Sequence, residues 1–199
     1  MSESSDTSET SDAPDTADPS DAFGTVTLVE QVLDTGTTAL LARSRIRVPG
    51  SVPLTMTRKH LPGGPTRPAV MLVHGFAQNR YSWHTSKRSL SGWLASQGWD
   101  TWNLELRGHG HSRDGDSMGA ERFSDYVDDV LLAAKSLPDR AFWVGHSLGA
   151  AALYGAATVE PKSTRGVVGI GGLYHFGRSN GVLNALGHAT HALSQAPWF

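Results

Sequence analysis

The chain has 199 residues, which is enough for one domain with a substantial core. It contains no cysteine, which excludes disulfides, thiolate nucleophiles and sulfur metal ligands and fits a reducing, cytoplasmic location. No apolar run is long enough to span a membrane, and the N-terminus lacks the basic and apolar regions of a secretory signal.

The net charge of −2 hides an asymmetry between the N-terminus and the rest of the chain. Seven acidic residues and no basic ones lie in residues 1–21, so the remainder has 12 acidic and 17 basic residues, a net charge of +5. Because residues 1–22 offer little apolar surface to bury, they are predicted to be a disordered acidic tail, either a solvating extension or an interaction tail. A scattered charge of +5 does not indicate nucleic-acid binding.

Strands and helices alternate along the rest of the chain. Residues 25–33 and 39–48 are apolar-rich and are interpreted as a short helix and a strand. Apolar or alternating runs predict further strands at 54–60, 69–73, 99–106, 141–144 and 166–173. Helical spacing predicts helices at 83–97, 124–137, with Ser124 as the N-cap, 147–158 and 183–193. This alternation favours an α/β fold, a mostly parallel central sheet with helices on both faces.

Three motifs directly follow predicted strands. The carboxyl ends of the strands are where an open α/β sheet places its ligand crevice. The three motifs are His74-Gly75-Phe76, Arg107-Gly108-His109-Gly110-His111-Ser112, and Gly145-His146-Ser147-Leu148-Gly149. The last is a G-x-S-x-G pattern between an apolar run and an Ala-rich helix, the arrangement that exposes a serine on a sharp turn. In this order, the three motifs resemble those of the α/β-hydrolase family, and the resemblance covers about residues 54–175.

The resemblance implies the roles of several residues. Ser147 would be the nucleophile, and the backbone N–H of Leu148 would be one oxyanion donor. The N–H of Phe76 would be the second donor, with Ala77 as the nearby alternative. His74 and His146 are interpreted as structural, and so is the 107–112 loop, with Arg107 paired to an acid. No metal and no organic cofactor is expected at His109 and His111 or at His188 and His191.

A serine nucleophile needs a base and an acid that orients the base, and in this family the acid and then the base follow the serine. Glu160 is the only acidic residue after Ser147, and it is too far along the helix to serve. His175, His188 and His191 follow without an acid between them and the serine in the right place. The chain is therefore interpreted as a C-terminally truncated hydrolase, with residues 23–175 as a partial core that lacks the last strands and residues 176–199 as the start of a lid.

The expected function is that of a serine hydrolase acting on small-molecule carboxylic esters or lipids through an acyl-enzyme, inactive or weakly active as this chain. A non-catalytic fragment is the competing hypothesis. An acyltransferase, thioesterase or peptidase of the same fold stays open as well, and the oligomeric state is not predicted.

Overall fold

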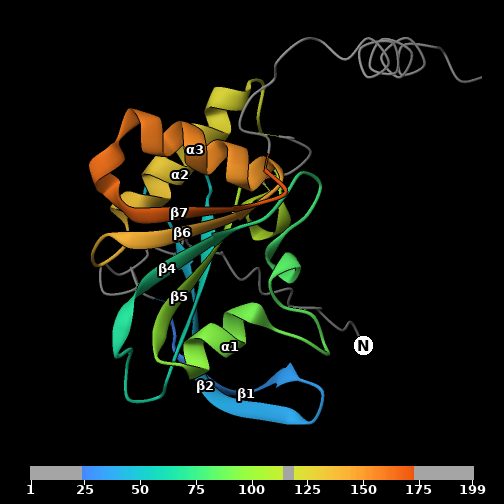
Figure 1. Ribbon diagram of the computed structural model, residues 1–199. Helices are drawn as coiled ribbons and strands as arrows, with labels where there is room; N and C mark the ends of the chain where they lie inside the picture. The colour runs from blue at the N-terminus through green and yellow to red at the C-terminus, as the bar shows by residue number, and fades with distance from the viewer. Residues whose placement is uncertain (1–23, 114–118, 173–199) are drawn as a thin grey trace, which may run out of the picture.

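The computed structural model describes residues 24–113 and 119–172, which form a seven-stranded sheet (Figure 1). Its strands are β1 (Thr27–Asp34), β2 (Thr37–Arg47), β3 (Thr55–His60), β4 (Arg67–Val73), β5 (Trp99–Glu105), β6 (Ala141–His146) and β7 (Thr164–Ile170). Their spatial order is β1-β2-β3-β5-β4-β6-β7. The pairings from β1 to β5 are antiparallel and those from β5 to β7 are parallel, so β2, β5, β4, β6 and β7 run in one direction.

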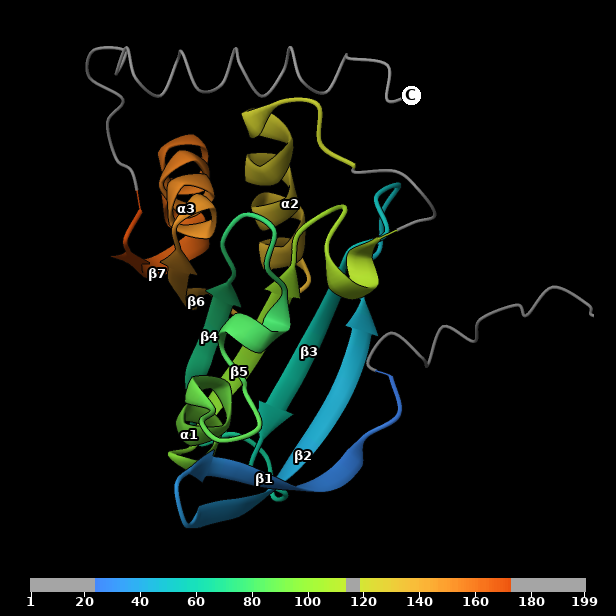
Figure 2. The ribbon, with the colours of Figure 1, turned by 90° about the vertical axis from the view of Figure 1, so that its right-hand side faces the viewer.

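Helices cover both faces of this sheet (Figures 1 and 2). α1 (Leu90–Ser96) packs on one face, and α2 (Phe123–Lys135) and α3 (Leu148–Val159) pack on the other. The short 3₁₀ turns are η2 (Arg80–Ser82), η3 (Gly110–Ser112) and η4 (Pro161–Ser163). The predicted α/β class is confirmed, and none of the helices described here is long and apolar enough to cross a membrane.

The central strand β4 shows why the sheet needs a layer on each side. Met71 and Val73 pack into the large core under α2 and α3, while Val70 and Leu72 pack with Trp83 on the α1 side. Successive side chains of a strand point to opposite faces, so an uninterrupted apolar run is buried twice. The prediction of a strand buried on both faces is confirmed.

Two predicted elements were wrong in type or length, and one cap was misplaced. Residues 25–33 are not a helix, because Thr27–Asp34 pairs with β2 in a hairpin that turns at Gly36, where φ is +75°. The helix predicted from residue 83 begins only at Leu90, after Ser89, whose hydroxyl accepts the Gly92 N–H at 2.9 Å. Helix α2 begins at Phe123, so Ser124 is not its N-cap.

The strand β7 lies at the edge of the sheet in the described part of the chain. It pairs with β6, and its Val168 and Ile170 side chains are 54% and 46% exposed. Such an apolar edge is the surface predicted for a sheet that lacks its next strand. The predicted tail, the lid segment and the helix at 183–193 lie outside the described residues.

Candidate active site

Ser147 sits on the turn between β6 and α3 in a strained backbone conformation. Its φ and ψ are +50° and −115°, a combination that residues with a Cβ rarely adopt. The backbone around it is held on both sides. The Ser147 N–H donates to the Ile170 carbonyl at 2.9 Å, and the Ser147 carbonyl accepts the Ala151 N–H at 3.1 Å. The turn therefore holds the serine at the C-terminal end of a parallel strand.

The two glycines of the motif allow the turn to be this tight. A Cβ on Gly145 would lie 2.6 Å from the backbone nitrogen of Ala150, at the start of α3. A Cβ on Gly149 would overlap the carbonyl oxygen of His74, at the end of β4. Both obstacles are backbone atoms, which cannot move aside as a flexible side chain can. Glycine is thus required at both positions for the helix to pack against the strand ends.

The hydroxyl of Ser147 and two nearby amides have no partners in the part of the chain that the structure describes. Ser147 is half-buried, and its hydroxyl makes no hydrogen bond with a described residue. The same holds for the backbone N–H groups of Leu148, the first residue of α3, and of Phe76. The loop that carries Phe76 lies against the turn, since a Cβ on Gly75 would be 3.3 Å from the Cβ of Ser147.

Gln78 connects the loop after β4 to the serine turn. Its side-chain oxygen accepts hydrogen bonds from the Gly75 N–H at 3.1 Å, the Ser82 hydroxyl at 3.0 Å and His146 Nδ1 at 3.1 Å. Gly75 directly precedes Phe76, and His146 directly precedes Ser147. One amide oxygen therefore fixes the spacing between the two segments, and the structure gives His146 this positioning contact rather than one to the serine hydroxyl.

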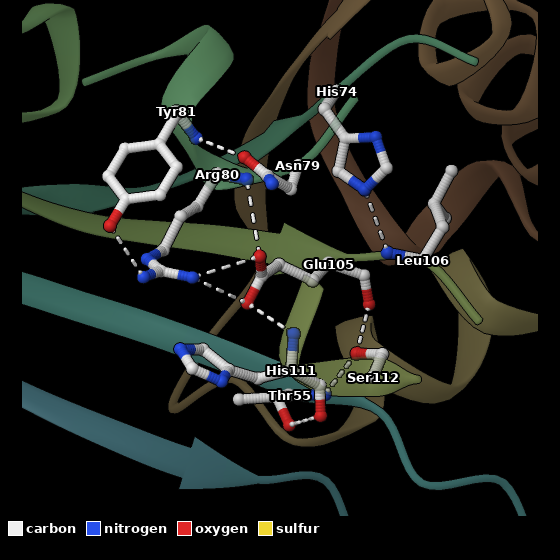
Figure 3. Close-up of polar contacts among 9 residues, drawn as sticks. All are labelled: Thr55, His74, Asn79, Arg80, Tyr81, Glu105, Leu106, His111 and Ser112. Carbon is white, nitrogen blue, oxygen red and sulfur yellow. Dashed lines mark hydrogen bonds and ion pairs between the residues drawn. The ribbon is translucent and has the colours of Figure 1, made fainter. Parts of the chain in front are cut away.

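His74 is a buried structural residue, as the sequence predicted. Its side chain is inaccessible to solvent, its Nδ1 lies 2.8 Å from the Gly75 carbonyl oxygen, and its Nε2 accepts the Leu106 N–H at 3.1 Å (Figure 3). A ring nitrogen that accepts from an amide cannot carry a proton, so Nδ1 carries it. Burial lowers the pKa of His74 to about 4 and keeps the ring neutral. The ring joins the ends of β4 and β5.

The 107–112 loop is also structural, and Arg107 pairs with an acid as predicted. Its guanidinium Nη2 and Nε lie 2.7 and 2.8 Å from Oδ1 of the fully buried Asp129 in α2, and its own N–H donates to Oδ2 at 2.9 Å. His109 is buried, and its Nδ1 lies 2.8 Å from the Arg107 carbonyl oxygen. Its ring therefore supports the loop.

Glu105, at the end of β5, organises the same loop from the other side (Figure 3). This fully buried carboxylate pairs with Arg80 at 3.2 Å and accepts the His111 backbone N–H at 3.2 Å. A Cβ on Gly110 would overlap the carboxylate, so glycine is needed there. Glu105 was not singled out from the sequence, because β5 carries other polar residues, Asp100, Thr101 and Asn103, and nothing local marked Glu105 among them.

A cavity of about 230 Å³ opens beside the Phe76 loop. It is lined by Phe76, Ala77, Gln78, Asn79, Gly108, His109, Gly110 and Arg113. Glu160 caps the far end of α3, where its carboxylate lies 3.7 Å from the Lys135 ammonium, so it is remote from Ser147 as predicted. His175, His188 and His191 lie outside the described residues.

This fold and this turn define a class of protein, the α/β-hydrolases. The sequence profile of the family described as "Serine aminopeptidase, S33" matches residues 64–196, more than half of the chain. The chain therefore belongs to this α/β-hydrolase family, and the resemblance seen in its three motifs is confirmed.

Curated relatives match part of this chain and a smaller part of their own length. Epoxide hydrolase B of Mycobacterium tuberculosis is 35% identical over 104 residues, which cover 52% of this chain and 28% of that protein. A pimeloyl-[acyl-carrier protein] methyl ester esterase of Aliivibrio fischeri is 32% identical over 93 residues, 47% of this chain and 32% of the relative. The chain thus matches about a third of the length of these two relatives.

Solved structures share the fold at lower identity. The thioesterase domain from the curacin biosynthetic pathway has a TM-score of 0.52 and 21% identity, with 86% of this chain and 56% of that chain covered. A monoacylglycerol lipase from Paleococcus ferrophilus has a TM-score of 0.52 and 24% identity, with 68% and 50% covered.

Proposed function

We propose that Ser147 is the nucleophile of a hydrolase that cleaves carboxylic esters, lipid esters included, through an acyl-enzyme. The observation that carries this proposal is the strained backbone of Ser147, which leaves its hydroxyl without a described partner at the N-terminus of α3. Strain of this kind persists only where surrounding contacts enforce it, and it is concentrated at functional sites.

The charge that develops on the substrate's carbonyl oxygen would be stabilised by two backbone N–H groups, those of Leu148 and Phe76. Leu148 belongs to the first turn of a helix, whose amides and dipole favour negative charge. Phe76 is 65% exposed and borders the 230 Å³ cavity, which would receive part of the substrate next to this donor. The Gln78 contacts would hold the two donors at a fixed spacing.

A serine nucleophile also favours esters over epoxides as substrates. Attack of the Ser147 hydroxyl on a carboxylic ester gives an acyl-serine and breaks the ester C–O bond, so that the alcohol leaves with the serine proton. Water can then hydrolyse the acyl-serine, which releases the carboxylic acid and regenerates the serine hydroxyl. Attack of a serine hydroxyl on an epoxide would give an ether, which water does not cleave, so the enzyme would stop after one event. For this reason the methyl ester esterase of Aliivibrio fischeri is a better guide to the chemistry of this chain than epoxide hydrolase B of Mycobacterium tuberculosis is.

We further propose that the 199-residue chain alone turns over slowly, because no described histidine contacts the Ser147 hydroxyl. The test is labelling by a fluorophosphonate together with hydrolysis of p-nitrophenyl butyrate, comparing the parent chain with Ser147→Ala. We expect slow labelling that Ser147→Ala abolishes, and ester hydrolysis close to the background rate. Equal labelling of the two proteins would refute Ser147 as the nucleophile. Rapid, sustained turnover by the parent chain would refute only the slow rate.

A further inference from the structure

One face of the sheet is polar across β2, β3 and β5, on the side covered by α1. The register places Arg45 beside Thr57 and Thr57 beside Asn103 across the three strands. Two residues along, Arg43 lies beside Lys59. Thr57, Lys59 and Asn103 are buried on this face, where apolar residues are expected, whereas the Arg43 and Arg45 side chains are exposed.

Two cavities adjoin these side chains. The smaller has a volume of about 60 Å³ and is lined by Arg43, Thr57, Lys59, Arg80, Tyr81, His84 and Asn103. The larger has a volume of about 260 Å³ and is lined by Thr25, Thr27, Arg43, Ser44, Arg45, Thr57 and Arg80. They share Arg43, Thr57 and Arg80, so they lie side by side, with Arg80 of η2 in the wall of both. A single water needs roughly 10–15 Å³, so even the smaller cavity can hold more than one water-sized group.

The walls of the two cavities carry uncompensated positive charge. Lys59 is only 2% exposed, and its ammonium donates to the neutral oxygens of Gln31 at 2.9 Å and Ser91 at 3.3 Å. The guanidinium groups of Arg43 and Arg45 have no partner within the described ranges, and none of the acidic residues in those ranges lines either cavity. A buried ammonium without a counter-charge is unfavourable. Burial and the charges of Arg43 and Arg80 lower the pKa of Lys59 to about 8.

Asn103 provides an unpaired polar group at the same place. Its side chain is 1% exposed and lines the smaller cavity, yet its Oδ1 has no hydrogen-bond partner within the described part of the chain. Buried polar atoms are nearly always paired in folded proteins. The amide can both donate and accept, which complements a group that presents oxygen acceptors and a hydroxyl, as a hydrogenphosphate does.

We propose that these two cavities form a binding site for an oxyanion, held by Arg43, Lys59 and Asn103. A hydrogenphosphate would donate its hydroxyl to Asn103 Oδ1, whereas a carboxylate would only accept from Asn103 Nδ2. Arginine is the side chain best suited to such groups because its planar donors match them in pairs. The anion would supply the missing counter-charge of Lys59. It could be a free ligand or a carboxylate of the acidic residues 1–21, since Thr25, which lines the larger cavity, follows Asp21 by four positions.

Calorimetric titration of the full chain with inorganic phosphate at low ionic strength tests the site. Arg43→Gln removes one wall of both cavities, and Arg47→Gln is the matched control, because Arg47 is an exposed arginine on the same strand that lines neither cavity. We expect saturable binding by the parent and by Arg47→Gln, and binding roughly 10- to 100-fold weaker in Arg43→Gln, since a charge-assisted hydrogen bond contributes about 1.5–3 kcal/mol and about 1.4 kcal/mol is tenfold in affinity. Both arginines are exposed, so we expect both variants to fold.

A further full-length variant, in which Asp12, Asp15, Asp18 and Asp21 are changed to Asn, separates the two sources of the anion. Tighter phosphate binding by this variant would show that the acidic segment occupies the site in the parent chain. Unchanged binding would show that the site takes a free anion. The proposal fails if neither the parent nor this variant binds phosphate saturably, or if Arg47→Gln weakens binding as much as Arg43→Gln does.

Discussion

Lowering the pH from about 7 to about 5 tests the role assigned to the buried imidazole of His74. In the folded protein this ring is neutral, because its Nε2 accepts the Leu106 N–H and burial lowers its pKa to about 4. In the unfolded chain its pKa returns to the ordinary value of 6.5. Between these two pKa values His74 is therefore protonated in the unfolded state and neutral in the folded state. The stability that this group contributes is complete above pH 6.5 and declines as the pH falls toward 4.

The size of this loss follows from the two pKa values. At about pH 5 the unfolded imidazole is almost fully protonated and the folded one is largely neutral, which lowers the free energy of unfolding by about 2 kcal/mol. Raising the pH above about 7 changes the contribution of His74 to the free energy of unfolding by only about 0.2 kcal/mol. For a domain of ordinary marginal stability, a loss of about 2 kcal/mol is easily measured.

The matched variant is His74→Gln, whose side-chain amide can accept from Leu106 and donate to Gly75 but does not titrate. Urea unfolding followed by fluorescence of the buried Trp102 and Trp143 gives the free energy of unfolding at both pH values. Other titrating groups, His84 among them, are common to the two proteins and cancel in the comparison. We expect the parent to lose about 2 kcal/mol more than the variant. Equal losses in the two proteins would refute the assignment of a neutral, buried His74.

The remaining predictions concern the buried ion pair and the Gln78 contacts. Asp129→Asn should lower the free energy of unfolding by about 3 kcal/mol, because it leaves the Arg107 charge without its partner. The double change Arg107→Met with Asp129→Asn should recover most of that loss, because it removes the unpaired charge and keeps an amide oxygen that accepts the backbone N–H of position 107. A double variant as unstable as the single one in urea would contradict this. Gln78→Ala should slow fluorophosphonate labelling of Ser147 by roughly 10-fold through loosened spacing, and Gln78→Glu, which keeps an acceptor, should restore most of the rate. Unchanged labelling of Gln78→Ala would exclude the positioning role.

The serine turn could be predicted from sequence because its requirements are local. A glycine on each side of Ser147 is needed so that α3 can approach the strand ends, and the flanking apolar runs specify β6 and α3. The structure moves the predicted strand and helix boundaries here by two residues or fewer. The sequence predicted that Arg107 pairs with an acidic residue. That residue, Asp129, lies 22 residues away on α2 and could not be identified from spacing alone.

Other features depended on contacts between distant segments. Residues 27–34 become a strand because they pair with β2, and their exposed apolar side chains, such as Leu28, obscured the alternation that marks a strand. The predicted start of α1 was too early because Trp83 fits the helical spacing, although it packs in the core from outside the helix. Ser89 gave a usable capping signal for the observed start. Gln78 had no sequence signal that linked it to the serine turn, since His146, the partner that makes this link, lies 68 residues away on β6.

The position of Ser147 finally depends on the outermost described strand. The serine N–H donates to the carbonyl of Ile170, the last residue of β7, and this strand pairs only with β6 in the described part of the chain. An edge strand with an exposed apolar face is less stable than a central one, because half of its backbone groups and much of its apolar surface remain uncovered. A further strand covering β7 would therefore stabilise the conformation of Ser147 without touching the serine. The strained backbone of Ser147 and the open edge of the sheet are thus coupled through one backbone hydrogen bond.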